Sequence, residues 1–342
     1  MWRFGRRELL MVLILLSLPC CSGNVKPIVR VTYYSPYPLA FYNAFWEQRI
    51  PDVTFKLTNP SDMPITVRIT SEYVGISYKA VTTVTIPPRK TVEINQTIPL
   101  ILDKIEEIKS ETKIPLHYVV ECRRGNGWYV ICEQTEMVDV YPINVMVWAL
   151  KLKDGRMKNM QDYIAVFVTP NSEAVQELLA KAKKFAPNHE LKGVEGKVLP
   201  QVEAIFDALK FEYNVSYVNT PFLYGRDYVQ RVRFPSESLK LKAINCVDGA
   251  VLFASALEAL GIRTFIVLLP DHALVAWEDP HNKLMYALET TLINSSFNVA
   301  LNEGLRELNE NWKNLTDRNP WNGYLVDIEA CRKAGIVPLP LY

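Results

Sequence analysis

A cysteine, a histidine and a glutamate occur in an order and spacing that could support nucleophilic catalysis. Cys246 follows Asn245 at the expected start of an apolar helix that runs to Leu260 and is closed by Gly261. Asn245 can cap this helix, and Asp248, three residues later, can complete a capping box. Cys246 would then occupy the first helical position, where unpaired backbone N–H groups and the helix dipole favour an anion. Because the thiolate is the nucleophilic form of cysteine, this position suits a reactive thiol.

The same N–H groups could bind the oxyanion of a tetrahedral intermediate. The alternative is that Cys246 is a small buried residue that only packs, since cysteine is among the most often buried residue types. On the helix start alone, packing is the more frequent outcome. The segments that follow the helix change this balance.

His272 and Glu289 flank an expected β-hairpin. A strand that starts at His272 leads into a turn over 279–282, and a second strand follows over 284–291. If the hairpin closes symmetrically on the four turn residues, His272 and Glu289 are directly opposed, with Cβ atoms roughly 5 Å apart. A carboxylate in that place would fix the imidazole tautomer and stabilise its protonated form. The alternative is a pair that serves only stability, and a one-residue slip would put the two residues on opposite faces.

Several short motifs surround these residues and follow one another along the chain. They are QRVRFPSE at 230–237, NCVD at 245–248, PDHA at 270–273 and LETT at 288–291, with VDI at 326–328 and GIVPLP at 335–340 behind them. In order and spacing they resemble the transglutaminase-like superfamily, and more narrowly its exported prokaryotic branch with a Cys, His and acidic triad. The resemblance covers roughly residues 164–340.

The resemblance implies a papain-like fold in which Cys246 is the nucleophile, His272 the base and Glu289 the orienting acid. Gln230 is the nearest upstream amide that could add a side-chain donor to the oxyanion hole, although an ordinary hydrated surface glutamine is an equal alternative. The chain departs from the family pattern in two places. Asp271 stands where members often have glycine, and Glu289 stands where many have aspartate.

The elements that must position these residues fall into two halves with different periodicity. Up to about residue 150, short β-branched and aromatic strands alternate with Asn-Pro, Pro-Pro and Gly-Asn-Gly breaks, which predicts an antiparallel, immunoglobulin-like β-sandwich. Helical spacing over 172–185 and 198–209 then begins a mixed region. We therefore expect an α+β protein with a signal peptide over 1–23, a β-sandwich domain over 24–150 and a transglutaminase-like domain over 151–342.

The N-terminus is typical of a secretory signal. Three arginines precede an apolar run over 9–18, which is shorter than the ~20 residues that span a bilayer. Cys20 or Cys21 could become the lipidated first residue of a lipoprotein, although the usual small residue before that cysteine is missing. We expect an exported protein, extracellular or at the cell surface. A lipid or an uncleaved signal is a possible membrane anchor.

Export would permit a disulfide between Cys122 and Cys132. Folding the expected hairpin about Gly127 puts the two cysteines opposite one another, close enough for a cross-strand bond. Two buried thiols are the alternative.

Composition excludes some classes of function. The 38 Lys and Arg residues balance 37 Asp and Glu residues, which gives no electrostatic case for nucleic acid. No closely spaced His/Cys pair lies near Cys246, so we expect no zinc site and no other cofactor.

The expected activity is acyl transfer from a protein or peptide substrate. Water as acceptor would make the chain a peptidase or amidase, and an amine would make it a protein-glutamine acyltransferase. We favour water, since no calcium-ligand loop is visible. The competing hypothesis is a surface binding or adhesion module that keeps the fold without turnover.

Overall fold

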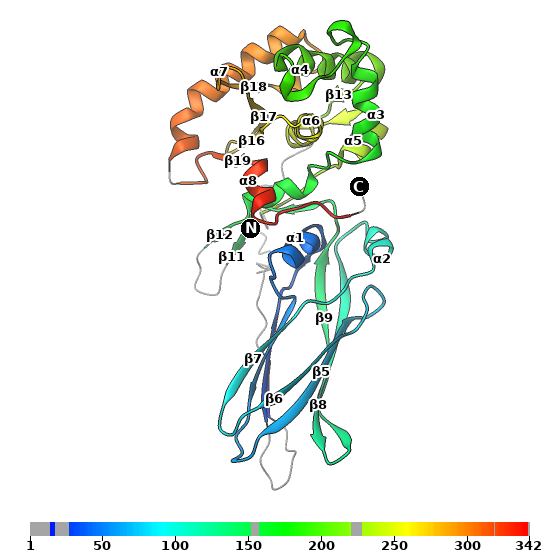
Figure 1. Ribbon diagram of the computed structural model, residues 1–342, viewed down its shortest axis with the longest axis vertical. Coiled ribbons are helices and arrows are strands. Elements are labelled where there is room, and N and C mark those ends of the chain that lie inside the picture. The colour runs from blue at the N-terminus through cyan, green and yellow to red at the C-terminus, as the bar shows by residue number, and fades with distance from the viewer. Residues whose placement is uncertain (1–13, 18–26, 152–156, 220–227, 318, 341–342) are drawn as a thin grey trace, which may run out of the picture. The chain divides into compact units, whose positions relative to one another are not determined.

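The computed structural model describes residues 14–17, 27–151, 157–219, 228–317 and 319–340. Helices and strands are both abundant and most strand pairs are antiparallel, so the fold is a mixed α and β one (Figure 1). Among the described residues, no helix combines the length and apolarity needed to cross a membrane. The expected signal peptide lies outside the described residues, except for Ile14–Ser17, which forms strand β1.

The chain divides into two compact units. Unit 1 comprises Met1–Ile143 with Lys151–Met157, and unit 2 comprises Asn144–Leu150 with Lys158–Tyr342. Relative to the expected boundary at residue 150, two short segments change sides: 144–150 belongs to unit 2 and 151–157 to unit 1. Strand β10 (Val145–Val147) belongs to unit 2 because it pairs with β14 (Val229–Arg231), far along the chain.

Unit 1 is built from two sheets. The first has the order β1-β2-β4-β7, and the second has the order β3-β9-β8-β5-β6. Their strands are β2 (Ile28–Tyr33), β3 (Tyr37–Pro38), β4 (Val53–Thr58), β5 (Ile65–Tyr73), β6 (Ala80–Ile86), β7 (Thr91–Gln96), β8 (Thr112–Arg124) and β9 (Gly127–Tyr141), with short helices α1 (Tyr42–Glu47) and α2 (Leu102–Glu106).

Side-chain alternation explains how these sheets pack. In β4 and β5 every second side chain is buried, which is the pattern of strands with one face on a core. The ring centroids of Phe55 in β4 and Tyr118 in β8 are 5.6 Å apart, so the buried faces of the two sheets meet.

The expected disulfide is not formed, because the hairpin of β8 and β9 has a different register. Its two-residue turn is Gly125-Asn126, with Gly125 at a φ of +59°, and Arg124 pairs with Gly127. Cys122 therefore pairs with Tyr129, and beyond a β-bulge between Val120 and Glu121 the partner of Cys132 is Val120. Both cysteines are buried and are not disulfide-bonded. The prediction was wrong because the turn is centred on Gly125-Asn126 rather than on Gly127, so Cys122 lies opposite Tyr129 instead of Cys132.

Unit 2 contains a second antiparallel sheet with the order β18-β17-β16-β19. Its strands are β16 (Thr264–Leu268), β17 (Ala273–Glu278), β18 (Met285–Leu288) and β19 (Tyr324–Asp327); shorter pairs join β11 (Ala149–Lys151) to β12 (Met157–Asn159) and β13 (Ser216–Tyr217) to β15 (Ala243–Ile244). The helices are α3 (Glu173–Ala182), α4 (Val198–Asp207), α5 (Pro235–Leu241), α6 (Cys246–Ala259), α7 (Phe297–Thr316) and α8 (Ile328–Lys333).

Both faces of this sheet are covered. Every residue of β16 is buried, and α6 is buried on all sides from Cys246 to Leu257, which is the character of a core helix. Figure 1 shows α6 between the sheet and helices α3 and α5, with α7 next to β18. One apolar cluster contains Leu274 and Ala287 from the sheet together with Leu308 of α7, so alternate strand residues face α7.

Candidate active site

Helix α6 starts at Cys246, as predicted. The Asn245 side chain accepts a hydrogen bond from the Asp248 N–H at 2.8 Å, and Asp248 Oδ2 accepts one from the Asn245 N–H at 3.2 Å. This reciprocal pair is the capping box that the sequence predicts. It fixes the direction of the first helical turn and therefore the position of the Cys246 side chain.

A buried ion pair fixes the cap in turn. The Asp248 carboxylate is fully buried and lies 2.7 Å from Arg233 Nη1, and it also accepts the Arg233 backbone N–H at 2.8 Å. Burial raises the pKa of Asp248, while the hydrogen bonds from Arg233 and Asn245 oppose this effect. Since each oxygen has donors, the charge can be kept away from water.

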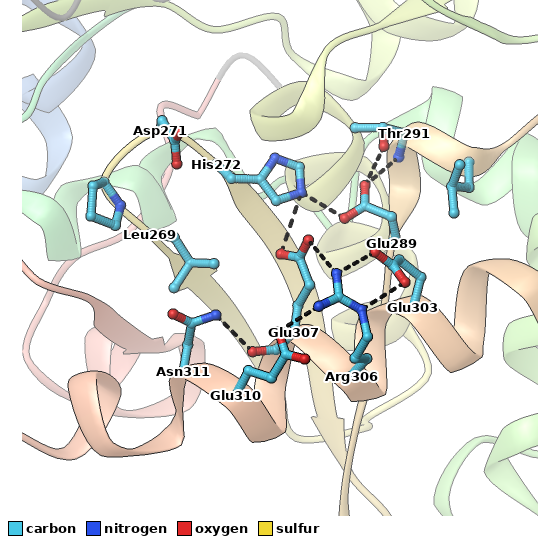
Figure 2. Close-up of a pocket in the computed structure, with 12 residues that line it drawn as sticks. Leu269, Asp271, His272, Glu289, Thr291, Glu303, Arg306, Glu307, Glu310 and Asn311 are labelled. Atoms are coloured by element: carbon cyan, nitrogen blue, oxygen red, sulfur yellow. Dashed lines mark hydrogen bonds and ion pairs between the residues drawn. The ribbon is translucent and has the colours of Figure 1, made fainter.

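His272 follows directly on a tight turn between β16 and β17. Leu269 N–H donates to the His272 carbonyl at 2.8 Å, which closes the turn just before β17. The imidazole Nε2 lies 2.6 Å from Glu289 Oε2, so the structure brings the expected base and acid together (Figure 2).

The hairpin register that led to this pair was wrong by two residues. In β17 and β18, Val275 pairs with Leu288, so Glu289 is a diagonal rather than a direct neighbour of His272. The turn is shifted by one residue, to 280–283, since the Asp279 N–H donates to the Leu284 carbonyl at 2.9 Å; within it the Asp279 side chain accepts the His281 N–H at 2.9 Å and Lys283 adopts a φ of +60°. A slip of two residues preserves the face on which a side chain lies, so the contact survives.

Glu289 is only 3% exposed and all its described contacts are polar. Oε2 faces His272, while Oε1 accepts the backbone N–H of Thr291 at 2.9 Å and a short hydrogen bond from the Thr291 hydroxyl. Its own backbone N–H donates to Ala300 at the start of α7. These bonds hold the carboxylate in a single orientation.

Cys246 completes the chain of contacts. Its interaction with His272 raises the pKa of the imidazole. Because Nε2 of the ring is turned to Glu289, Nδ1 is the nitrogen available to the sulfur. Burial acts to lower the pKa of His272, but the interactions with Cys246 and Glu289 outweigh it and raise this pKa to about 10. At neutral pH the imidazole is therefore protonated and carries a positive charge.

Two glycines allow the elements of the site to approach closely. A Cβ at Gly249 of α6 would lie 2.4 Å from the Thr290 hydroxyl, and one at Gly304 of α7 would lie 2.5 Å from the Ala287 carbonyl. Only glycine lets α6 approach the segment that carries Glu289, and only glycine lets α7 lie directly on β18.

Two residues near the site were missed from the sequence. Glu307 of α7 places Oε2 3.9 Å from His272 Nε2. Tyr217 of β13 lies opposite Ile244 in β15, and burial together with the charges of Cys246 and Glu289 raises the pKa of its hydroxyl. Neither has a local signal, because each is brought to the site by an element far from the three expected residues.

A hollow of about 530 Å³ opens on the Glu307 side of the imidazole. Besides His272 and Glu289, half of the other lining residues come from α7: Glu303, Arg306, Glu307, Glu310 and Asn311 (Figure 2). Arg306 contacts the carboxylates of Glu303, Glu307 and Glu310. Cys246 does not line this hollow and is 3% exposed.

Gln230 is buried in β14, opposite Met146, and is not the hydrated surface residue that was the alternative. Its Oε1 has no hydrogen-bond partner among the described residues. No described contact joins Gln230 to Cys246. Gln230 is linked to the start of α6 along the backbone, because Arg233, three residues later, binds Asp248.

His272, Glu289 and Glu307 are also the described residues whose ligand atoms come close enough to hold a metal ion, all within 4.8 Å of one another. A cation would have to displace the proton that Nε2 shares with Glu289. Since the pKa of His272 is raised to about 10, that proton competes strongly with a metal at neutral pH.

Comparison with known proteins adds no family. No family model matches the chain, and no curated protein matches it. Among solved structures, a protein from Archaeoglobus fulgidus is similar over 38% of this chain and 94% of its own, with 13% identity and a TM-score of 0.22. A proposed protease from Parabacteroides distasonis is similar over 78% of this chain and 67% of its own, with 10% identity and a TM-score of 0.26. At such TM-scores neither similarity supports an assignment.

Replacing Arg233 should destabilise unit 2. Arg233→Leu leaves the Asp248 carboxylate buried without its cation, so we expect the free energy of unfolding to fall by about 3 kcal/mol in urea denaturation. Lys184→Leu is the control, because Lys184 pairs with Glu212 at the surface of the same unit. That variant should lose at most about 1 kcal/mol. Equal losses in the two variants would contradict a structural role for the cap.

Glu289→Gln should change how stability depends on pH. The pKa of His272 is raised from 6.5 to about 10, so its contribution is fully present below pH 6.5 and is lost as the pH rises through 10. We expect Glu289→Gln to be less stable than the wild type by about 2 kcal/mol at pH 6. The difference should shrink towards pH 10.5. A difference that stays constant over this range would show that Glu289 does not act on the His272 charge.

Proposed function

We propose that this chain is an exported cysteine-dependent acyl-transfer enzyme, a peptidase or amidase that acts through Cys246, His272 and Glu289. The observation that carries the proposal is that His272 is hydrogen-bonded to Glu289 at 2.6 Å and also interacts with Cys246 at the start of a capped helix. A structural His–Glu pair does not need a thiol on its other ring nitrogen. A cysteine that only packs does not need an imidazolium beside it.

The proposed reaction begins with attack of the Cys246 thiolate on an amide carbonyl carbon. The His272 imidazolium then donates its proton to the amine nitrogen as the C–N bond breaks, which leaves an acyl-enzyme. In the second step, neutral His272 takes a proton from water, the hydroxide attacks the thioester, and the thiolate departs with its electron pair. Glu289 holds the ring orientation throughout and stabilises its protonated form.

The capping box suggests where an oxyanion would bind. It uses the N–H groups of Asn245 and Asp248. By helix geometry the N–H groups of Cys246 and Val247, at the first two helical positions, have no carbonyl four residues earlier within the helix. They are the donors we assign to the oxyanion of the tetrahedral intermediate. Gln230 remains a candidate for an additional side-chain donor.

The finer fold assignment belongs to the same proposal. The packed sheets of unit 1 are compatible with an immunoglobulin-like sandwich. In unit 2, a buried helix that carries the cysteine lies against an antiparallel sheet that carries the histidine, which is compatible with a papain-like fold of the transglutaminase-like type. Water remains the acceptor we favour over an amine, and a protein or peptide remains the substrate.

One observation favours the competing hypothesis of a binding module without turnover. The Cys246 side chain is almost covered, at 3% exposure, and the hollow beside His272 does not reach it. Substrate access therefore requires some displacement of the residues over the sulfur. A module that binds without reacting requires none.

A peptide-library digest separates the two functions. Incubation of the wild-type chain with a mixed peptide library should produce cleaved products identified by mass spectrometry, and Cys246→Ala should produce none. Cys331→Ala is the matched control, because Cys331 is a buried thiol whose pKa burial raises to about 12. It should cleave as the wild type does. Absence of cleavage by the wild type, together with retention of peptides by both the wild type and Cys246→Ala, would overturn the enzyme and support the binding module.

A further inference from the structure

His272 faces a second carboxylate besides Glu289. Oε2 of Glu307 lies 3.9 Å from Nε2, the same nitrogen that lies 2.6 Å from Glu289 (Figure 2). The two acids come from different elements, Glu307 from the middle of α7 and Glu289 from the end of β18. At 3.9 Å the contact is too long for a hydrogen bond, so Glu307 acts on the imidazole through its charge.

The packing of α7 determines this placement. Gly304 lies against the backbone of β18, where a Cβ would clash with Ala287. Glu307 follows three residues later, so it lies on the same side of the helix as Gly304, next to Leu308 in the core. The Glu307 carboxylate is also only 22% exposed, which strengthens its charge interaction with the ring.

We propose that Glu307 is a positioning residue for the reaction, a second acid that holds the His272 imidazole protonated and directed towards Cys246. This inference rests on the proposed function, since it assigns Glu307 to the same site. Glu289 accepts the Nε2 proton, and Glu307 adds negative charge on the side of the hollow.

The other charged groups around the ring are consistent with this role. Burial raises the pKa of Glu307; the positive charges of His272 and Arg306 oppose this rise, and the charges of Glu289 and Glu303 add to it. Arg306 Nη2 lies 3.6 Å from the other oxygen of Glu307, but it is also held by Glu303 and Glu310. Asp271 adjoins the ring along the chain and lines the same hollow.

A second acid has a chemical consequence for the proposed cycle. Because two carboxylates favour the imidazolium, they make neutral His272 a stronger base. This helps it to take the proton from water when the acyl-enzyme is hydrolysed.

The test is an NMR titration of His272 in the full chain labelled with ¹⁵N-histidine. The chain has four histidines, so the His272 signal is assigned by its loss in His272→Gln. Glu307→Gln should lower the pKa of His272 by about one pH unit. Glu303→Gln is the control, because Glu303 lies one turn earlier on α7 and contacts Arg306 rather than His272. It should shift the titration less than Glu307→Gln does, and Glu307→Asp should restore part of the shift.

A second variant guards against a simple folding defect. Arg306→Gln removes the cation that competes for Glu307 and should raise the pKa of His272, a change opposite in sign to that of Glu307→Gln. The proposal is overturned if Glu307→Gln titrates as the wild type does, or if Glu303→Gln lowers the pKa by as much. Failure of the proposed function is a separate result: the peptide digest would show no cleavage while the titration could still respond to Glu307.

Discussion

The hydrogen bond between His272 and Glu289 is the interaction on which the arrangement of unit 2 depends. It joins the Glu289 carboxylate, whose side chain is 4% exposed, to an imidazole that is 23% exposed, at 2.6 Å. An unpaired Glu289 carboxylate at 3% exposure would be costly, so the surrounding elements must keep His272 within reach. Three features keep His272 and Glu289 together: the tight turn before β17, the hydrogen bonds of Glu289 with Thr291, and the packing of α7 on β18.

The same pair couples the two faces of the sheet. Glu289 lies two residues after Ala287, and His272 two residues before Leu274. Their side chains are therefore on the same face of the sheet as those of Ala287 and Leu274, which face α7. Cys246 belongs to α6, which packs with β16 and β17. The His272 imidazole lies at the end of the strands and interacts with residues from both faces. Its Nε2 faces Glu289 and Glu307, and its other side faces the thiol of Cys246. Gly249 permits this junction, because α6 can approach the Glu289 segment only without a Cβ there.

Local signals in the sequence predicted the start of α6, its capping box and the pairing of His272 with Glu289. These depend on contacts between near neighbours or on strand alternation, which tolerates a slip of two residues. The sequence did not predict the turn position that separates Cys122 from Cys132, because Gly125 and Gly127 both suit the centre of a turn. It also did not predict Glu307 or Tyr217, whose positions depend on how α7 and β13 pack. The transfer of 144–150 to unit 2 likewise depends on a long-range strand pair.

The central claim is that His272 holds Cys246 as a thiolate, and alkylation kinetics test it most directly. The rate of iodoacetamide labelling at Cys246 should be measured by mass spectrometry at pH 6, where a free thiol of pKa about 8.5 is less than about 1% ionised. The account predicts that wild-type Cys246 reacts at least about tenfold faster than a free thiol and that His272→Gln removes this advantage. It is contradicted if Cys246 reacts no faster than a free thiol and His272→Gln leaves its rate unchanged.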